Sequence, residues 1–354
     1  MLAIPFAAGI AIAPCLAGLT SDAWILCSFL YPALCMMLLS ALAFRIRSYL
    51  YTALLFLLTG CLCMLGSEAG SAFSSAAGSG GFASGAGDML SAAVDRIGFK
   101  NETCAALVKA LICGDRSRLD RETVELFRKS GASHILALSG LHLGILYGLI
   151  LRLCSVFGNS PAARRARSLC TVALTGIYTL ATGASPSLTR AFIFICINEA
   201  LRNTERKRHG ADVLFTAMLI QLAIFPQALF SVGFQLSYLA MTGIVFVYPH
   251  MESWYPAPKA PARGGPVRRI WQSASLSISC QLFTAPLSWL KFGSLPGYFL
   301  ISNLAALPLS SALMLLSTGG VITAAFGHCP DLLVALMEKT AALLTEVLTV
   351  ISGM

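Results

Sequence analysis

The sequence predicts an all-α fold: a polytopic transmembrane protein of about 9–11 spans or half-spans, with an extracytoplasmic amphipathic helical hairpin. Three observations support this fold class. The chain is 56% hydrophobic and only 12% charged, with a mean hydropathy of +0.76, whereas soluble proteins carry about 25% charged residues. Apolar runs of roughly 20 residues, enough to cross a bilayer, recur along most of the chain. Basic residues gather in every second loop between these runs.

The apolar runs locate the predicted membrane segments. Three lie near the N-terminus, at about 3–19, 23–43 and 49–65. Eight follow, at about 135–157, 169–182, 188–201, 211–225, 230–248, 271–290, 298–320 and 331–351. The segments at 169–182 and 188–201 are short for a full crossing, so half-helices or re-entrant segments remain open for them.

The basic loops predict an orientation. Fourteen of the 25 Lys and Arg residues lie in four alternate loops: Arg45, Arg47, Arg152, Arg164, Arg165, Arg167, Arg202, Arg206, Lys207, Arg208, Lys259, Arg263, Arg268 and Arg269. Cytoplasmic loops of membrane proteins carry such an excess. The pattern therefore predicts a multi-pass protein of the bacterial inner membrane with a cytoplasmic N-terminus, and it accounts for most of the net charge of +9.

Composition divides the chain into three predicted parts. Residues 1–65 form N-terminal transmembrane helices, residues 66–90 form a linker rich in Gly, Ser and Ala, and residues 91–354 form a second transmembrane domain. The alternation of charge places residues 66–133 on the extracytoplasmic side of the membrane.

The segment before the fourth apolar run predicts the helical hairpin. Apolar residues recur at helical spacing: Leu107, Val108, Leu111 and Ile112, then Val124 and Phe127. Asp120 is placed as an N-cap, and Gly114 and Gly131 as C-caps. The hairpin either lies on the outer membrane surface or packs on the spans. Its basic residues form an outer lip, which is either an ordinary solvated face or a receiver for a polyanion. The lip consists of Arg116, Arg118, Arg121, Arg128 and Lys129.

The stretch HILALSGLHLG, residues 134–144, begins the fourth apolar run and holds His134, Ser139 and His142. Ser139 and His142 are three residues apart, which on a helix permits a hydrogen bond between their side chains. A serine beside a base is the minimum for an intramembrane hydrolase, but no orienting carboxylate is evident nearby. Helix packing and a pore mouth are the other two interpretations.

Other polar residues are spread over several predicted spans, where they either bond neighbouring helices or line a hydrated pathway. They are Arg190, Glu199, Gln221, Gln235, Gln281 and Asn303. No nucleotide-binding loop, GxGxxG or HEXXH motif occurs, and none of the twelve cysteines has zinc-type spacing. No cofactor, metal site or catalytic residue is expected.

Four ordered blocks carry a resemblance to a known family. They are FRKSGASHILALSGLHLGIL (127–146) with the preceding ALICGDRSRLDRETVELF, GASPSLTRAFIF with Arg190, FPQALFSVGFQLSYLAMTGI with Gln235 and Ser237, and QLFTAPLSWLKFGSLPGYFLISNLAALPL with Asn303. The set, over about 95–310, resembles the ComEC competence-protein family, inner-membrane channels for DNA uptake. The OB-like and metallo-β-lactamase-like domains of many members have no counterpart in this sequence.

The resemblance implies a competence-type channel domain at 91–354 that passes single-stranded DNA into the cytoplasm and is not an enzyme. The pathway residues it implies are His134, Ser139, Gly140, His142, Arg190, Gln235, Ser237 and Asn303. Partners would be single-stranded DNA, the lipid bilayer, a separate nuclease and a cytoplasmic DNA translocase, with a homo-oligomer left open. Two alternatives remain: an intramembrane serine hydrolase using Ser139 and His142, or a non-catalytic scaffold that recruits DNA-processing partners.

Overall fold

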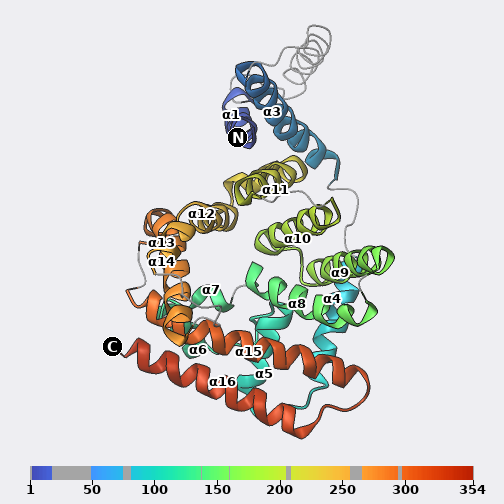
Figure 1. Ribbon diagram of the computed structural model, residues 1–354, viewed down its shortest axis with the longest axis vertical. Coiled ribbons are helices and arrows are strands. Elements are labelled where there is room, and N and C mark those ends of the chain that lie inside the picture. The colour runs from blue at the N-terminus through green and yellow to red at the C-terminus, as the bar shows by residue number, and fades with distance from the viewer. Residues whose placement is uncertain are drawn as a thin grey trace. The chain divides into compact units, whose positions relative to one another are not determined.

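The computed structural model describes residues 2–17, 49–74, 81–136, 138–158, 160–204, 209–255, 265–293 and 297–353 (Figure 1). Every regular element in these ranges is a helix, as predicted. Two helical stretches among them, Val232–Ser253 and Phe299–Ala325, are long and apolar enough to cross a membrane. The polytopic arrangement therefore stays a prediction, and the span expected at 23–43 lies outside the described residues.

The chain forms two compact units, the first made of residues 1–80 and 206–238. Its elements are α1 (Ala3–Ala17), α3 (Tyr49–Ser74), α11 (Gly210–Ile224), η2 (Pro226–Phe230) and the start of α12 (Val232–Phe246). Helices α1 and α3 pack backbone to backbone at Gly9 and Gly60. A side chain at either position would overlap the facing main chain, so glycine permits the close approach. The Cys61 thiol donates to the carbonyl of Gly9 at 3.0 Å across this contact.

The second unit, residues 81–205 and 239–354, holds the predicted hairpin and most of the candidate residues. Besides the rest of α12 it comprises α4 (Gly81–Asp95), α5 (Glu102–Cys113), α6 (Arg121–Lys129), α7 (Ser133–Leu136), α8 (Gly140–Cys154), η1 (Ser155–Phe157), α9 (Pro161–Ala181), α10 (Pro186–Thr204), α13 (Tyr248–Ser253), α14 (Pro266–Phe292), α15 (Phe299–Ala325) and α16 (Asp331–Ser352).

The hairpin of α5 and α6 packs against α15 and α16 in the main apolar core of this unit. Phe127 of α6 is fully buried there, together with Leu107 of α5, Leu313 of α15 and Met337 of α16. Of the two placements predicted for the hairpin, the one packed on neighbouring helices is therefore observed. Val124 was expected on the apolar face but is 40% exposed, because the turn of α6 directs its neighbour Thr123 inward instead.

The predicted caps of the hairpin are confirmed. The carboxylate of Asp120 accepts from the backbone amide of Thr123 at 3.1 Å at the start of α6. Gly114 follows α5 with a φ of 77°, and Gly131 follows α6 with the same φ, a left-handed conformation that glycine adopts without strain. A further cap comes from α16, where Glu338 accepts from the amides of Lys100 and Asn101 at 2.7 and 3.0 Å.

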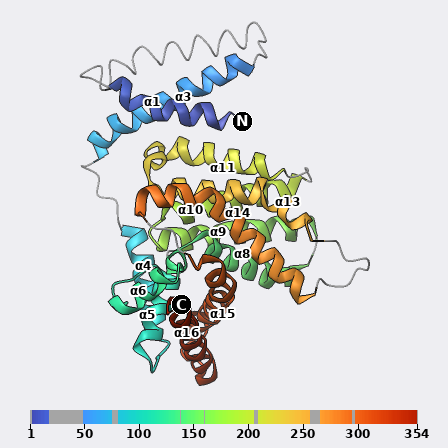
Figure 2. The ribbon, with the colours of Figure 1, turned by 90° about the vertical axis from the view of Figure 1, so that its left-hand side faces the viewer.

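Helices α15 and α16 run across α9 and α10. In Figure 1, α15 and α16 extend across the view beside each other while α9 and α10 are foreshortened. In Figure 2, turned by 90°, α9 and α10 extend across the view. A single membrane normal therefore cannot run along both pairs.

Two expected boundaries differ from the structure. Much of the linker expected at 66–90 is helical, since residues 66–74 continue α3 and residues 81–90 belong to α4. Val94 anchors the end of α4 in the apolar core, so packing supports this helix despite its glycines. The two segments expected to be short, 169–182 and 188–201, are parts of the longer helices α9 and α10.

Truncation of the buried aromatic ring should destabilise the second unit. We expect Phe127→Ala to lower the free energy of unfolding by about 3–5 kcal/mol, because it removes a filled core volume. Val124→Ala, on the exposed side of the same helix, should change it by less than about 1 kcal/mol. Denaturant unfolding of the detergent-solubilised protein measures both, and equal losses would contradict the packing described.

The N-cap of α6 should give the hairpin an acid-sensitive contribution to stability. Hydrogen bonding to Thr123 holds the pKa of Asp120 below its usual value. Its contribution is therefore complete above the unfolded pKa, about 3.9, and is lost as pH falls through the lower folded value. Asn is an equally good N-cap that does not titrate. We expect Asp120→Asn to match the wild type in thermal stability at pH 7 and to exceed it at pH 2; a constant difference would contradict this role.

Candidate functional site

The stretch 134–144 folds as a short helix, a break and the first turn of α8. Ser139 is the N-cap of α8, with extended backbone at φ −111° and ψ 163°, so it does not share a helical face with His142. Its backbone amide donates to Nδ1 of His142 at 3.2 Å. This is the reverse half of a capping box, in which the N3 side chain satisfies the N-cap amide. His142 is buried, with 2% exposure, whereas His134 on α7 is exposed.

The start of α8 lies against the start of α10. A side chain added at Gly140 would come within 3.3 Å of both the Cβ of Ala191 and Nη2 of Arg190. Arg190 is 8% exposed, and its Nη2 donates to the hydroxyl of Ser187 at 3.4 Å. The structure thus brings together three of the predicted residues, Gly140, His142 and Arg190, at one end of α8 and α10.

A polar cluster at the other end of these helices joins α8 to α10. The hydroxyl of Tyr147 donates to Oε1 of Glu199 at 2.5 Å and accepts from Nδ2 of Asn198 at 2.9 Å. Arg202 also donates to Oε1 of Glu199, at 3.1 Å. Glu199 is only 4% exposed, so its charge is balanced inside the protein. The sequence identified Glu199, but no local spacing relates it to Tyr147, 52 residues earlier.

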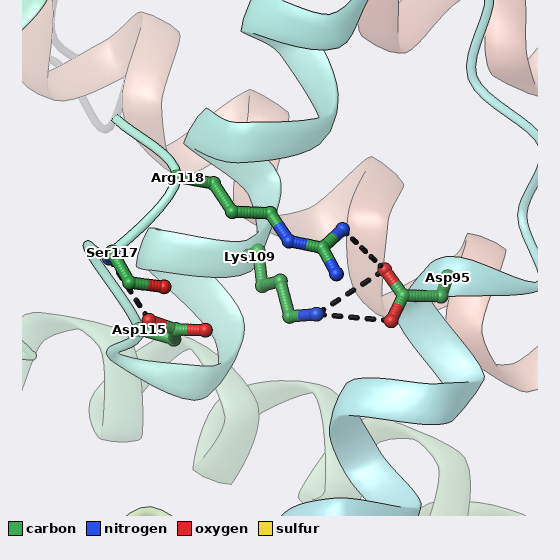
Figure 3. A network of polar contacts seen from close by, with 5 residues as sticks. All are labelled: Asp95, Lys109, Asp115, Ser117 and Arg118. Atoms are coloured by element: carbon green, nitrogen blue, oxygen red, sulfur yellow. Dashed lines mark hydrogen bonds and ion pairs between the residues drawn. The ribbon is translucent and has the colours of Figure 1, made fainter. Parts of the chain in front are cut away.

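The basic lip separates into tethered and available side chains. Nε of Arg116 donates to the carbonyl of Leu136 in α7 at 3.0 Å. Arg118 pairs with Asp95 at 3.1 Å, and the buried Lys109 pairs with the same carboxylate at 2.9 Å (Figure 3). Figure 3 shows both cations reaching this one acid from α5 and the loop that follows it.

The remaining lip residues lie on α6. Arg128 is exposed and 3.4 Å from Glu125 one turn earlier, a weak contact at such exposure. Arg121 and Lys129 are exposed, and neither makes an ion pair within the part of the chain that the structure describes. These two are the lip cations most available to a ligand.

Asn303 follows a residue that fastens α15 to the hairpin. The hydroxyl of Ser302 donates to the carbonyl of Ser130, just after α6. The Oδ1 atom of Asn303 is buried and has no hydrogen-bond partner among the described residues. A buried amide oxygen without a donor is uncommon and costly, so this position offers an unused acceptor.

Two predicted residues belong to the first unit. Gln235 donates through Nε2 to the carbonyl of Leu229 at 2.9 Å, within the turn that precedes α12. Ser237 is half-buried on α12. Another amide of that unit, Gln221, accepts from the Tyr238 hydroxyl at 3.0 Å. Gln221 and Gln235 therefore both make hydrogen bonds to other residues of the first unit.

The described residues contain no cluster of His, Cys, Asp or Glu able to hold a metal ion. In the hairpin, burial raises the pKa of the Cys104 thiol to about 12 and that of Cys113 to about 11. Both are therefore neutral thiols at pH 7 and poor nucleophiles.

Comparison with known proteins identifies the family. The chain is 30% identical over 139 residues to ComE operon protein 3 of Bacillus subtilis, a match covering 39% of this chain and 18% of that protein. It is 27% identical over 221 residues to Recombination protein 2 of Haemophilus influenzae (59% and 27%). It is 25% identical over 209 residues to the uncharacterised protein YcaI of Escherichia coli (58% and 27%).

The matched segments therefore span little more than a quarter of these relatives, or less. No solved structure matches the chain. A family model described as Competence protein matches residues 111–354, which include the hairpin's end, the α7–α8 turn and all of α8 to α16. By this match over more than half of its length, the chain belongs to the Competence protein family.

Proposed function

We propose that the protein is a membrane component of DNA uptake in transformation that passes single-stranded DNA into the cytoplasm. Membership of the Competence family, together with matches to ComE operon protein 3 and Recombination protein 2, carries this proposal. The structural observations below support its membrane location and the route of the strand.

The distribution of side chains on α9 supports a membrane location. Its inner face is hydroxylated, with Ser168, Thr171, Thr175 and Thr179 buried. Its outer face is apolar, with Leu169, Leu174, Ile177 and Leu180 each at least 45% exposed. Helices α14 and α15 repeat this pattern, with buried serines and exposed leucines, isoleucines or tryptophan. A soluble protein places these residue types the other way round, whereas lipid accepts apolar side chains outside and small polar ones between helices.

The basic residues support the direction of crossing. Arg152 lies in the last turn of α8, Arg164 and Arg165 in the first turns of α9, and Arg202 in the last turn of α10. Because successive helices alternate in direction, these ends form one side of the bundle, and the positive-inside rule assigns that side to the cytoplasm. Ser139, Gly140 and Arg190 then belong to the outer side, next to the hairpin.

The strand would meet the lip first. Arg121 and Lys129 supply phosphate contacts, which dominate affinity for nucleic acid and tolerate any sequence. Arg190 and the unused acceptor of Asn303 belong to the polar lining beyond it. A separate nuclease and a cytoplasmic translocase are the partners this role requires.

The test is deletion of the gene in a transformable host, with internalisation of labelled DNA as the readout. Uptake should fall to background and return when the wild-type gene is supplied. Unchanged uptake, in a host without a second copy, would remove the proposal. A scaffold that only recruits partners would instead fail to carry DNA when the purified protein is reconstituted alone in liposomes.

The two available lip cations should contribute to DNA binding without holding the fold. We expect the double substitution Arg121→Gln and Lys129→Gln to weaken binding of single-stranded DNA and to lower the slope of log affinity against log salt by about 1.4, as each lost phosphate contact removes about 0.7. Thermal stability should be unchanged. Arg116→Gln is the matched control: it should lower the free energy of unfolding by about 1 kcal/mol through the lost bond to Leu136. An unaltered salt slope in the double variant would rule out the lip as a phosphate-binding surface.

The histidine at 142 should act as a helix cap rather than as a catalytic base. We expect His142→Gln to keep stability and uptake, because glutamine at N3 also accepts from the N-cap amide. His142→Ala should destabilise by about 1 kcal/mol or more. Ser139→Ala should preserve uptake, because the backbone amide of residue 139 still donates to His142. Serine-reactive phosphonate labelling that disappears in both Ser139→Ala and His142→Gln would instead establish the hydrolase alternative.

A further inference from the structure

Helix α16 has two long faces, of which only one is covered. The covered face packs on α15, α5 and α6 and consists of Val334, Met337, Ala341, Leu344, Leu348 and Ile351. The opposite face is exposed and carries a second stripe at the same alternating spacing of four and three residues. It consists of Leu332, Leu336, Lys339, Leu343, Glu346 and Val350. This spacing is typical of a helix that packs along its length against another helix.

Small residues accompany the exposed stripe. Ala335, Ala342 and Thr349 are also exposed and recur every seven residues beside it. Small side chains let two helices approach closely, which is the usual basis of helix association in membranes.

Two charged residues, Lys339 and Glu346, lie inside the exposed stripe. Lys339 and Glu346 are seven residues apart, about 10 Å along the helix axis, so they do not pair with each other. Neither makes an ion pair with any residue that the structure describes. A lipid surface is a poor cover for them, because ionisable groups amid an apolar stripe are costly in lipid.

The stripe is complementary to itself when a second copy of α16 runs antiparallel. If Lys339 faces Glu346 of the second copy, symmetry makes Glu346 face the second copy's Lys339, which gives two ion pairs. The same register sets Leu343 opposite Ala342, Leu336 opposite Thr349 and Val350 opposite Ala335. A large side chain therefore meets a small one at each of these three levels, as interdigitated packing requires.

The direction of α16 permits this pairing in a membrane. Helices α15 and α16 run across α9 and α10 (Figures 1 and 2). A two-fold axis along α9 and α10 therefore turns α16 into an antiparallel copy of itself. If α9 and α10 cross the bilayer, as proposed above, the same axis inserts both copies the same way round.

We propose that the exposed face of α16 docks antiparallel against α16 of a second copy of this chain, with Lys339 opposite Glu346 on both sides of the two-fold axis. This dimer interface relies on the proposed direction of crossing but not on DNA as the cargo.

Charge reversal tests the register. In the full-length protein in detergent micelles, Lys339→Glu alone and Glu346→Lys alone should each raise the dimer dissociation constant by about tenfold or more, because like charges then meet at two symmetric positions. The double variant should restore the wild-type value. Lys291→Glu, an exposed reversal on α14, should leave it unchanged. Single variants that dimerise as well as wild type, or a double variant that stays monomeric, would overturn the proposal.

Photo-crosslinking in native membranes tests the direction. A photo-reactive amino acid at position 336 should attach to the second copy near residue 349, and one at position 343 near residue 342. Cleavage after Lys339 separates the peptides that hold residues 336 and 349. Attachment of position 336 near residue 336 of the second copy would indicate a parallel contact. Attachment to lipid alone would indicate that the bilayer covers this face. Either result would reject the antiparallel dimer. Since DNA uptake is not the readout, failure of this test is distinct from failure of the proposed function.

Discussion

The second unit depends on one local interaction: the buried threonine hydroxyls of α9 are satisfied by the helix that carries them. On α9, Thr171, Thr175 and Thr179 each donate to the carbonyl four residues earlier, at 2.7 to 2.8 Å. This bonding removes the cost of burying a hydroxyl without requiring a partner on another helix. It leaves the outer face of the same helix free to be apolar. The inside-out distribution on α9 therefore follows from local bonds.

Contacts between helices can then be few and specific. Glu199 is held by Tyr147 and Arg202 at one end of α8 and α10, while Gly140 admits Arg190 at the other. Near the hairpin, Arg116 reaches Leu136 of α7 and Ser302 reaches Ser130. The loop after α5 is thus bonded to α7, and α15 is bonded to the residue that follows α6.

The features that the sequence predicted correctly are those that depend on residues close to one another along the chain. The caps at Asp120, Gly114 and Gly131 were predicted because each acts within a few residues. Val124 was misplaced because the side of α6 that is buried is set by α15 and α16, which lie far along the chain. The contact of Glu199 with Tyr147 could not be foreseen, since only the packing of α8 on α10 brings them together. The linker was expected from its Gly, Ser and Ala content, yet much of it is helical, and the burial of Val94 in the core, which anchors α4, could not be read from that composition.

The contact between Ser139 and His142 depends on the backbone conformation at Ser139 as well as on the spacing of the two residues. A separation of three residues predicted that the side chains of Ser139 and His142 share one helical face. The helix begins at Gly140, however, so Ser139 lies outside it. The bond that forms is then from amide to imidazole, and Nδ1 is occupied by the cap. With Nδ1 accepting, the ring's proton is assigned to Nε2. His142 therefore satisfies the first free amide of a buried helix end, which explains a polar side chain at 2% exposure without invoking catalysis.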